Sequence, residues 1–193
     1  MKIRPFIICT LLIIPLGIAF YNYEKYLPTF TSSHQALSKE EILELIKTKP
    51  VTSIEVFKNQ RLLLLKSNQD VIRQYPIRLG FNPKGHKHFE NDGRTPEGIY
   101  SIDWRNSQSA YYKSLHISYP NAKDIAYAKQ HHQPTGGDIM IHGSVPKSLL
   151  SMPFSSTYMP HKDWTLGCIA VRNVDIDEIW QLVPNKTKII IYP

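Results

Sequence analysis

A histidine and a cysteine in the second half of the chain have the residue types that thiol-based acyl transfer requires. His142 and Gly143 end one apolar run, and Cys168 follows Gly167 at the start of another. A thiol is intrinsically nucleophilic, and a neighbouring imidazole raises its thiolate fraction at neutral pH. We therefore predict that Cys168 is the nucleophile. We predict His142 as the general base, which later returns the proton to the leaving amine.

Glycines stand beside both of these residues. Gly167 allows a tight turn, in which the N–H groups of Gly167 and Cys168 would face the substrate oxygen, and Gly143 gives similar freedom beside the base. The other cysteine, Cys9, lies in the apolar N-terminal segment, so Cys168 has no disulfide partner in the rest of the chain. A chance His–Cys pair, or a buried inert thiol, is the alternative that spacing alone leaves open.

The N-terminus has the pattern of an export signal. Lys2 and Arg4 precede an uncharged and mostly apolar run over residues 6–20, which is the order of charge and hydrophobicity found in signal sequences. We predict a signal anchor or signal peptide in residues 1–23, and we favour the uncleaved anchor because two tyrosines follow the run. The remainder would then be exported, either anchored to the membrane or secreted.

The chain is basic, with a formal net charge of +7. Its lysines and arginines are scattered, and the longest basic cluster is the short one at residues 84–87. We therefore expect a solvated basic surface and no nucleic-acid partner, although an anionic polymer would suit such a surface.

The pattern of apolar residues predicts a fold that is mainly β with short helices. We expect a linker and a short helix in residues 24–50, because Ser38 and Glu41 form a capping box and Pro50 ends the helix. A catalytic domain would occupy residues 51–193, with a late helix capped by Asp175. Strands are expected at 54–57, 61–65, 71–72, 75–79, 99–104, 114–118, 138–142, 169–171 and 188–192, and another helix at 124–130.

The catalytic candidates resemble a family signature. His142-Gly143 followed by Thr165-Leu166-Gly167-Cys168-Ile169 is similar to that of the L,D-transpeptidase (YkuD-domain) family, which has a His-Gly pair, a spacer and then Ser/Thr-x-Gly-Cys. The run Arg-Thr-Pro-Glu-Gly-Ile-Tyr at residues 94–100 resembles the family's substrate-side segment. The similarity spans about residues 52–192. It implies a YkuD-like β-sandwich catalytic domain, here behind an N-terminal membrane segment.

The resemblance implies an enzyme that acts on peptidoglycan stem peptides in cell-wall cross-linking or remodelling. Such enzymes attack the bond after the L-centre of meso-diaminopimelate in a tetrapeptide stem and release D-alanine. The acyl group, held as a thioester on the cysteine, passes to the side-chain amine of another stem or to a lipoprotein's terminal lysine. Water as acceptor instead gives a carboxypeptidase, or a hydrolase that releases wall-bound lipoprotein. The family mechanism needs no cofactor, and we expect a monomer.

Four more residues are predicted to bind substrate: His116, Arg94, Arg172 and Trp164. His116 would orient His142 or touch substrate, with a core histidine as the alternative. Arg94 would bind a stem carboxylate. The simpler alternative is that Arg94 is an ordinary arginine of a surface loop. Many family members place Arg or Asn two residues after the cysteine, whereas this chain has Ala170 there and Arg172 two residues later.

The long spacer between the histidine and the cysteine predicts an inserted lid between Ser144 and Asp163. Aromatic residues of this region, Trp164 among them, would line the cleft or pack the lid.

Three competing interpretations remain at this point. Several other histidines could suggest a metal, but their spacings match no zinc pattern and no cysteine accompanies them, so we predict no metal site. They are His86, His88, His131, His132 and His161. A sortase-like thiol transpeptidase is the nearest rival chemistry. A non-catalytic wall-binding module is the rival from another class, and it would tolerate the loss of Cys168.

Overall fold

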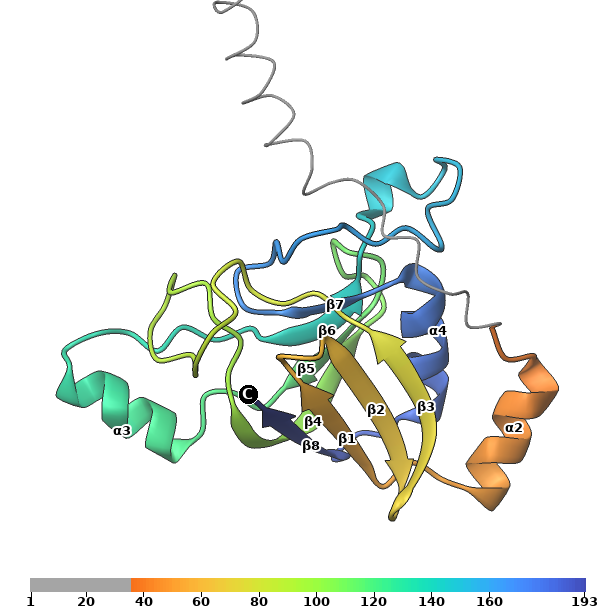
Figure 1. Cartoon of the computed structure of the whole chain (residues 1–193), viewed down its shortest axis with the longest axis horizontal. Helices are drawn as coiled ribbons and strands as arrows, with labels where there is room; N and C mark the ends of the chain where they lie inside the picture. Colours follow the sequence, from red (N-terminus) through yellow and green to blue (C-terminus); the bar gives the residue numbers. More distant parts are fainter. Residues whose placement is uncertain (1–35) are drawn as a thin grey trace, which may run out of the picture.

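The computed structural model describes residues 36–193, so the membrane segment predicted for residues 1–23 lies outside the described part. Within residues 36–193, no helix combines the length and apolar character needed to cross a membrane. The fold is mainly β with short helices, as the sequence predicts. Figure 1 shows the strands gathered in the centre, with α2 and α3 at opposite ends.

Eight strands of the described chain form one continuous order, β3-β2-β1-β8-β4-β5-β6-β7. The β1–β8 and β6–β7 pairs are parallel, and the other five are antiparallel. The strands are β1 (Ser53–Phe57), β2 (Leu62–Ser67), β3 (Asp70–Pro76), β4 (Gly98–Asn106), β5 (Ser114–Ile117), β6 (Met140–Gly143), β7 (Ile169–Val171) and β8 (Lys188–Tyr192).

The sheet bends at β4 and returns toward itself. The register between β4 and β5 shifts between Ile102 and Arg105, and such irregularities increase local bending and twist. Beyond β3, Arg78 forms an antiparallel bridge with Ala170, and Gly80 a parallel bridge with Thr165. The two ends of the strand order therefore meet beside Cys168, and the halves enclose a core in the manner of the predicted sandwich.

That core is built by alternation along the strands. Side chains of successive strand residues point to opposite faces, and Ile54 and Leu65 from one half join Ile117, Ile141 and Ile169 from the other in one buried cluster. The intervening residues of β5, β6 and β7 lie on the outer face. This face carries the candidate chemistry.

Helix α2 (Lys39–Thr48) belongs to the folded unit. Its predicted capping box is present, with Ser38 as the N-cap and Glu41 completing the box. Ile42 is buried in the core, and the Leu37 amide donates to Glu178 Oε1 at 2.7 Å. The domain boundary expected at residue 50 therefore does not separate this helix from the core.

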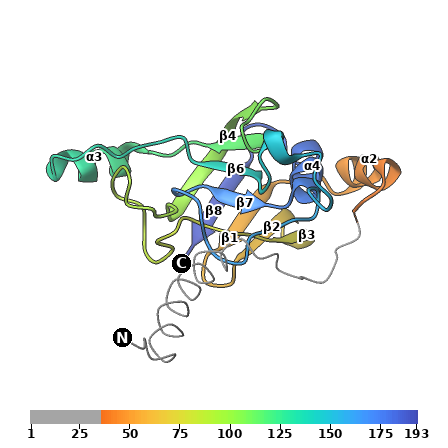
Figure 2. The ribbon, with the colours of Figure 1, turned by 90° about the horizontal axis from the view of Figure 1, so that it is seen from above.

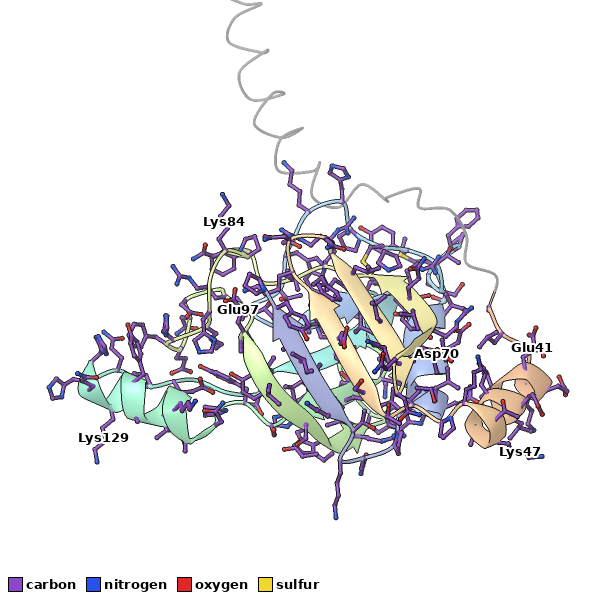
Figure 3. All side chains as sticks on the ribbon, turned by 60° about the horizontal axis from the view of Figure 1, so that its bottom comes forward. Glu41, Lys47, Asp70, Lys84, Glu97 and Lys129 are labelled. Carbon is purple, nitrogen blue, oxygen red and sulfur yellow. The ribbon has the colours of Figure 1, made fainter. Side chains whose placement is uncertain are left out.

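Helix α3 (Ala122–Gln130) and helix α4 (Asn173–Leu182) complete the described helices, with a single 3-10 turn, η1, at Lys147–Leu149. Viewed from above, α3 and α2 again lie at opposite ends (Figure 2), and Lys129 on α3 is far from Glu41 and Lys47 on α2 (Figure 3).

The predicted start of α4 was wrong by one turn. The helix is capped by Arg172, not by Asp175, and Asp175 occupies the third helical position. Its carboxylate accepts hydrogen bonds from the Arg172 amide and guanidinium, so only the half of a capping box that the third helical residue supplies is present. Glu178, further along α4, accepts the Leu37 amide and so holds the start of α2 against α4.

Candidate active site

The β6–β7 pair brings the histidine and the cysteine together. In the parallel register His142 pairs with Ala170 and Ile141 with Ile169. Cys168 directly precedes β7, and the register continued by one residue sets it opposite Met140. His142, Ala170 and Cys168 share the outer face, because side chains two apart on a strand point the same way. Strand spacing and rise put the Cα atoms of His142 and Cys168 ~8 Å apart, which an imidazole and a thiol can bridge.

His142 is held in one orientation and one tautomer. Its Nδ1 donates to the Gly143 carbonyl oxygen at 2.7 Å, which leaves Nε2 as the nitrogen that can accept a proton. The Tyr111 ring lies 5.1 Å and the Trp164 ring 5.7 Å from the imidazole. The residue is only 6% exposed, and this burial lowers the pKa of His142 to about 4. The imidazole is therefore neutral at physiological pH.

Cys168 is half-buried, and its thiol donates to the Asp138 carbonyl oxygen at 3.4 Å. Burial raises the pKa of the Cys168 thiol above its ordinary value, although the Met140 backbone N–H and the charge of Lys87 act in the opposite direction. The resting pair is accordingly a neutral thiol and a neutral imidazole. Proton transfer to His142 then has to accompany attack by the sulfur.

The turn that carries Cys168 is braced by Thr165. Its hydroxyl donates to the Cys168 carbonyl at 2.7 Å and accepts the Gly167 amide at 3.1 Å. The Gly143 amide donates to the carbonyls of Tyr111 and Lys113. Both glycine amides are thus used inside the protein. This contradicts the oxyanion role predicted for the Gly167 amide and leaves the Cys168 amide as the predicted donor.

The glycines nevertheless permit close packing. Gly167 has φ +138°, and a Cβ there would lie 2.6 Å from the Arg94 carbonyl oxygen. A Cβ on Gly80 would lie 2.1 Å from the Gly93 carbonyl oxygen and 3.1 Å from Gly167 Cα. The nucleophile turn therefore rests on the backbone of residues 93–94, where the predicted substrate-side segment begins.

That segment is fixed to the sheet by a buried lysine. Lys58 is 1% exposed and donates to the carbonyls of Gly85 and Thr95 and to Glu97 Oε1, at 2.6 to 2.9 Å. Thr95 in turn accepts the Gly80 amide at 3.2 Å. An amine buried with three acceptors holds the loop in one position, so the surface facing Cys168 is preformed.

The insertion over residues 144–163, called the lid below, is attached at both ends. Near its start the Ser144 hydroxyl donates to the Tyr158 carbonyl. Near its end Arg78 Nε donates to the Pro160 carbonyl at 2.7 Å, and Arg61 forms a forked ion pair with Asp163. In Figure 1 the cyan part of the lid stands above the sheet.

A cavity of about 520 Å³ is lined mostly by lid residues, and Trp164 and Tyr111 form the rest of its wall. The same two rings flank His142, so this cavity adjoins the base. A larger cavity, of about 890 Å³, is lined by residues of α3, β4 and β8 and includes neither Cys168 nor His142.

The other predicted binding residues fall in different places. Trp164 lies beside His142. Arg94 packs its backbone against Gly167, while its guanidinium approaches the His86 carbonyl at 3.4 Å. His116 contacts Asp103 and Trp104 on β4 and does not orient His142.

Arg172 does not fit its predicted role in substrate binding. It is 4% exposed, and its guanidinium donates to both carboxylate oxygens of Asp175, at 2.6 and 2.7 Å. A charge buried with its partner in this way stabilises the first turn of α4 and is not available to a ligand.

Sequence reasoning missed several residues that build the site. Asp138 supplies the carbonyl that meets the thiol, and its φ of +53° is unusual for a residue other than glycine. Tyr111 flanks the base from an irregular segment, and Asp163 anchors the end of the lid. No local motif marks the last two, because their role depends on segments distant in the sequence.

Comparison with known proteins identifies the family. Residues 52–191 match the L,D-transpeptidase catalytic domain, YkuD, which is most of the chain. The "Putative L,D-transpeptidase YafK" of Escherichia coli K12 is 32% identical over 160 residues, covering 79% of this chain and 54% of that protein. This chain therefore belongs to the YkuD L,D-transpeptidase family.

Solved structures agree on the fold. Bd1075 of Bdellovibrio bacteriovorus is 27% identical with a TM-score of 0.50, over 76% of this chain and 49% of that one. The helical cell shape determining protein Pgp2 of Campylobacter jejuni is 22% identical with a TM-score of 0.54, over 81% and 56% of the two chains. This chain thus spans about half the length of the relatives that it matches.

Proposed function

We propose that this protein is a peptidoglycan L,D-transpeptidase that acts on tetrapeptide stems through a thioester on Cys168, at the periplasmic or cell-wall face of a bacterium. The observation that supports the proposal is the position of Cys168 directly before β7, the strand that pairs in parallel with β6 and its His142, with His142 Nδ1 bound to the Gly143 carbonyl. Family membership supplies the substrate class.

The first half-reaction follows from the resting protonation states. Because the thiol and the imidazole are both neutral, Nε2 of His142 takes the Cys168 proton as the sulfur attacks the stem carbonyl carbon. The tetrahedral intermediate collapses when its C–N bond breaks, and the imidazolium gives its proton to the departing D-alanine amine. A thioester remains, and His142 is neutral again.

The second half-reaction reverses these roles. An amine of another stem loses a proton to His142 as it attacks the thioester carbonyl, and the sulfur leaves and is reprotonated. Water in place of the amine gives the hydrolytic alternative, either a carboxypeptidase or an enzyme that releases a wall-attached lipoprotein. The neutral resting pair serves either acceptor, so the acceptor has to be identified by product analysis.

The test is muropeptide mass analysis after incubating the full-length protein with tetrapeptide-stem wall fragments, beside Cys168→Ala and His142→Ala. We expect loss of D-alanine and a new stem-to-stem cross-link that both variants lack. Tripeptide alone would indicate a carboxypeptidase, and release of a lysine-terminated peptide the lipoprotein hydrolase. Unchanged turnover by Cys168→Ala would exclude the thioester, and no Cys168-dependent change at all would favour the wall-binding module.

A further inference from the structure

A row of side chains leads from Cys168 across the outer face of the sheet. Met140 on β6 pairs with His116 on β5, and the β6–β7 register continued by one residue sets Met140 opposite Cys168. The next strand, β4, has Trp104 stacked on His116, with ring centroids 4.7 Å apart and planes inclined by 16°. The nucleophile and an aromatic side chain thus lie at two ends of one row.

The end of this row at β4 combines an exposed ring with oriented polar groups. Trp104 is 41% exposed although Ile102, two residues earlier on β4, is fully buried, because the register of β4 shifts between Ile102 and Arg105. His116 Nδ1 lies 2.6 Å from Asp103 Oδ1, and the same oxygen accepts the Trp104 amide at 2.9 Å. His116 Nδ1 is therefore occupied by Asp103, and Nε2 is the ring nitrogen that remains for a ligand.

These groups suit an uncharged sugar. An indole face packs against the apolar C–H face of a pyranose ring, and a carboxylate and an imidazole nitrogen accept hydrogen bonds from ring hydroxyls. The Asp103 side chain is 41% exposed and so can reach a ligand. The Asp103 carboxylate at the centre of the cluster makes another carboxylate or a phosphate a poor occupant.

The spacing matches the substrate of the proposed function. In a stem attached to its glycan, the lactyl linkage, two residues and the attacked residue itself lie between the sugar and the attacked carbonyl, and about four extended units span ~13 Å. Adjacent strands lie about 4.8 Å apart, so His116 is ~10 Å from Cys168 and Trp104 is ~14 Å away. A stem with its carbonyl at the thiol would therefore place its sugar over this cluster.

We propose that Trp104, His116 and Asp103 form a subsite for the glycan sugar that carries the stem peptide. This inference rests on the proposed function for the identity of the substrate, but the sugar-binding chemistry can be tested without turnover. The subsite would make the enzyme prefer stems still attached to glycan over free peptides. Met140 would form the floor between the subsite and the thiol.

Direct binding is the first test. Titration of the full-length protein with an N-acetylglucosamine tetramer is followed by NMR through the indole N–H signals of the three tryptophans, Trp104, Trp164 and Trp180. We expect the Trp104 signal to shift, the Trp180 signal to stay, and the shift to weaken in Asp103→Asn. A Trp104 signal that does not move at millimolar sugar would overturn the proposal, whatever the enzymatic activity proves to be.

The second test compares two substrates, the disaccharide tetrapeptide and the free tetrapeptide. We expect Trp104→Ala to lower kcat/KM about 3- to 10-fold for the disaccharide substrate alone, as the loss of one stacking contact implies, and Trp104→Phe to restore most of it. Tyr127→Ala on α3, with a similar exposure of 40%, is the matched control and should change neither value.

The outcomes separate the two proposals. An equal loss on both substrates would mean that Trp104 only supports the packing of His116, and the subsite would be refuted while the activity stands. Absence of Cys168-dependent turnover of either substrate would refute the proposed function. The sugar titration would then decide the subsite by itself.

Discussion

Replacing Gly167 by alanine tests how the nucleophile turn is positioned. The new Cβ would lie 2.6 Å from the Arg94 carbonyl oxygen and 3.1 Å from Ile139 Cδ1. The first contact is with backbone, so it cannot be relieved by rotating a side chain. The turn itself has to move away from residues 93–94, and Cys168, the next residue, moves with it.

The magnitude has two parts. A φ of +138° is a region in which a residue other than glycine costs on the order of 1–3 kcal/mol. A displacement of the nucleophile approaching 1 Å costs roughly 100-fold in rate, because attack requires near-contact geometry. We therefore expect Gly167→Ala to lose about 2 kcal/mol of unfolding free energy and roughly 100-fold in the rate of acylation.

Single-turnover formation of the acyl-enzyme, measured by intact-protein mass spectrometry, reports the rate, and urea unfolding reports the stability. Gly137→Ala is the matched control: it precedes Asp138, has no positive φ, and its Cβ would meet nothing within 4 Å. It should acylate at the rate of the unsubstituted protein. Normal acylation by Gly167→Ala would refute the claim that contact with Arg94 positions the thiol.

Two further predictions concern ionisable groups. Because burial lowers the pKa of His142 to about 4, the imidazole stays a base well below neutrality, and kcat/KM should remain level down to about pH 5 and fall as pH drops through about 4. An acid limb near pH 6.5 in a stopped-flow pH profile would instead indicate a solvated imidazole. The Glu178 carboxylate accepts from Leu37, Arg73 and Tyr75, so Glu178→Gln should cost about 3 kcal/mol and expose α2 to proteolysis. The exposed pair Lys49–Asp70 supplies the control, Asp70→Asn, which should leave urea unfolding nearly unchanged; equal effects of the two substitutions would contradict the role of Glu178.

The parts of the fold that follow from local pattern could be predicted. Alternation of apolar residues located the strands, and the capping box at Ser38 located α2. The family signature placed His142 and Cys168, and the structure brings them onto adjacent strands because both segments are apolar and buried on their other face. Each of these signals is contained within a few neighbouring residues.

What could not be predicted depends on distant partners. The predicted strand at 75–79 ends as β3 at Pro76, and the residues beyond it bridge to the other end of the sheet. The sequence suggests that the Arg172 guanidinium is available to bind substrate, but in the structure it forms an ion pair with Asp175 in the first turn of α4. The Gly167 amide donates its hydrogen bond to the Thr165 hydroxyl and so is not available to substrate. Periodicity assigns a residue to a face but does not say which remote segment covers that face.

The bridges of Arg78 to Ala170 and of Gly80 to Thr165 have a consequence for folding. They join segments separated by nearly half of the chain, and they flank Cys168 on both sides. Contacts of such high sequence separation carry a large loop-closure entropy and form late. The Cys168 thiol therefore reaches its final position only after the two ends of the sheet have paired. Acyl-transfer activity therefore requires the complete strand order. A partly folded chain contains Cys168 but has no assembled active site.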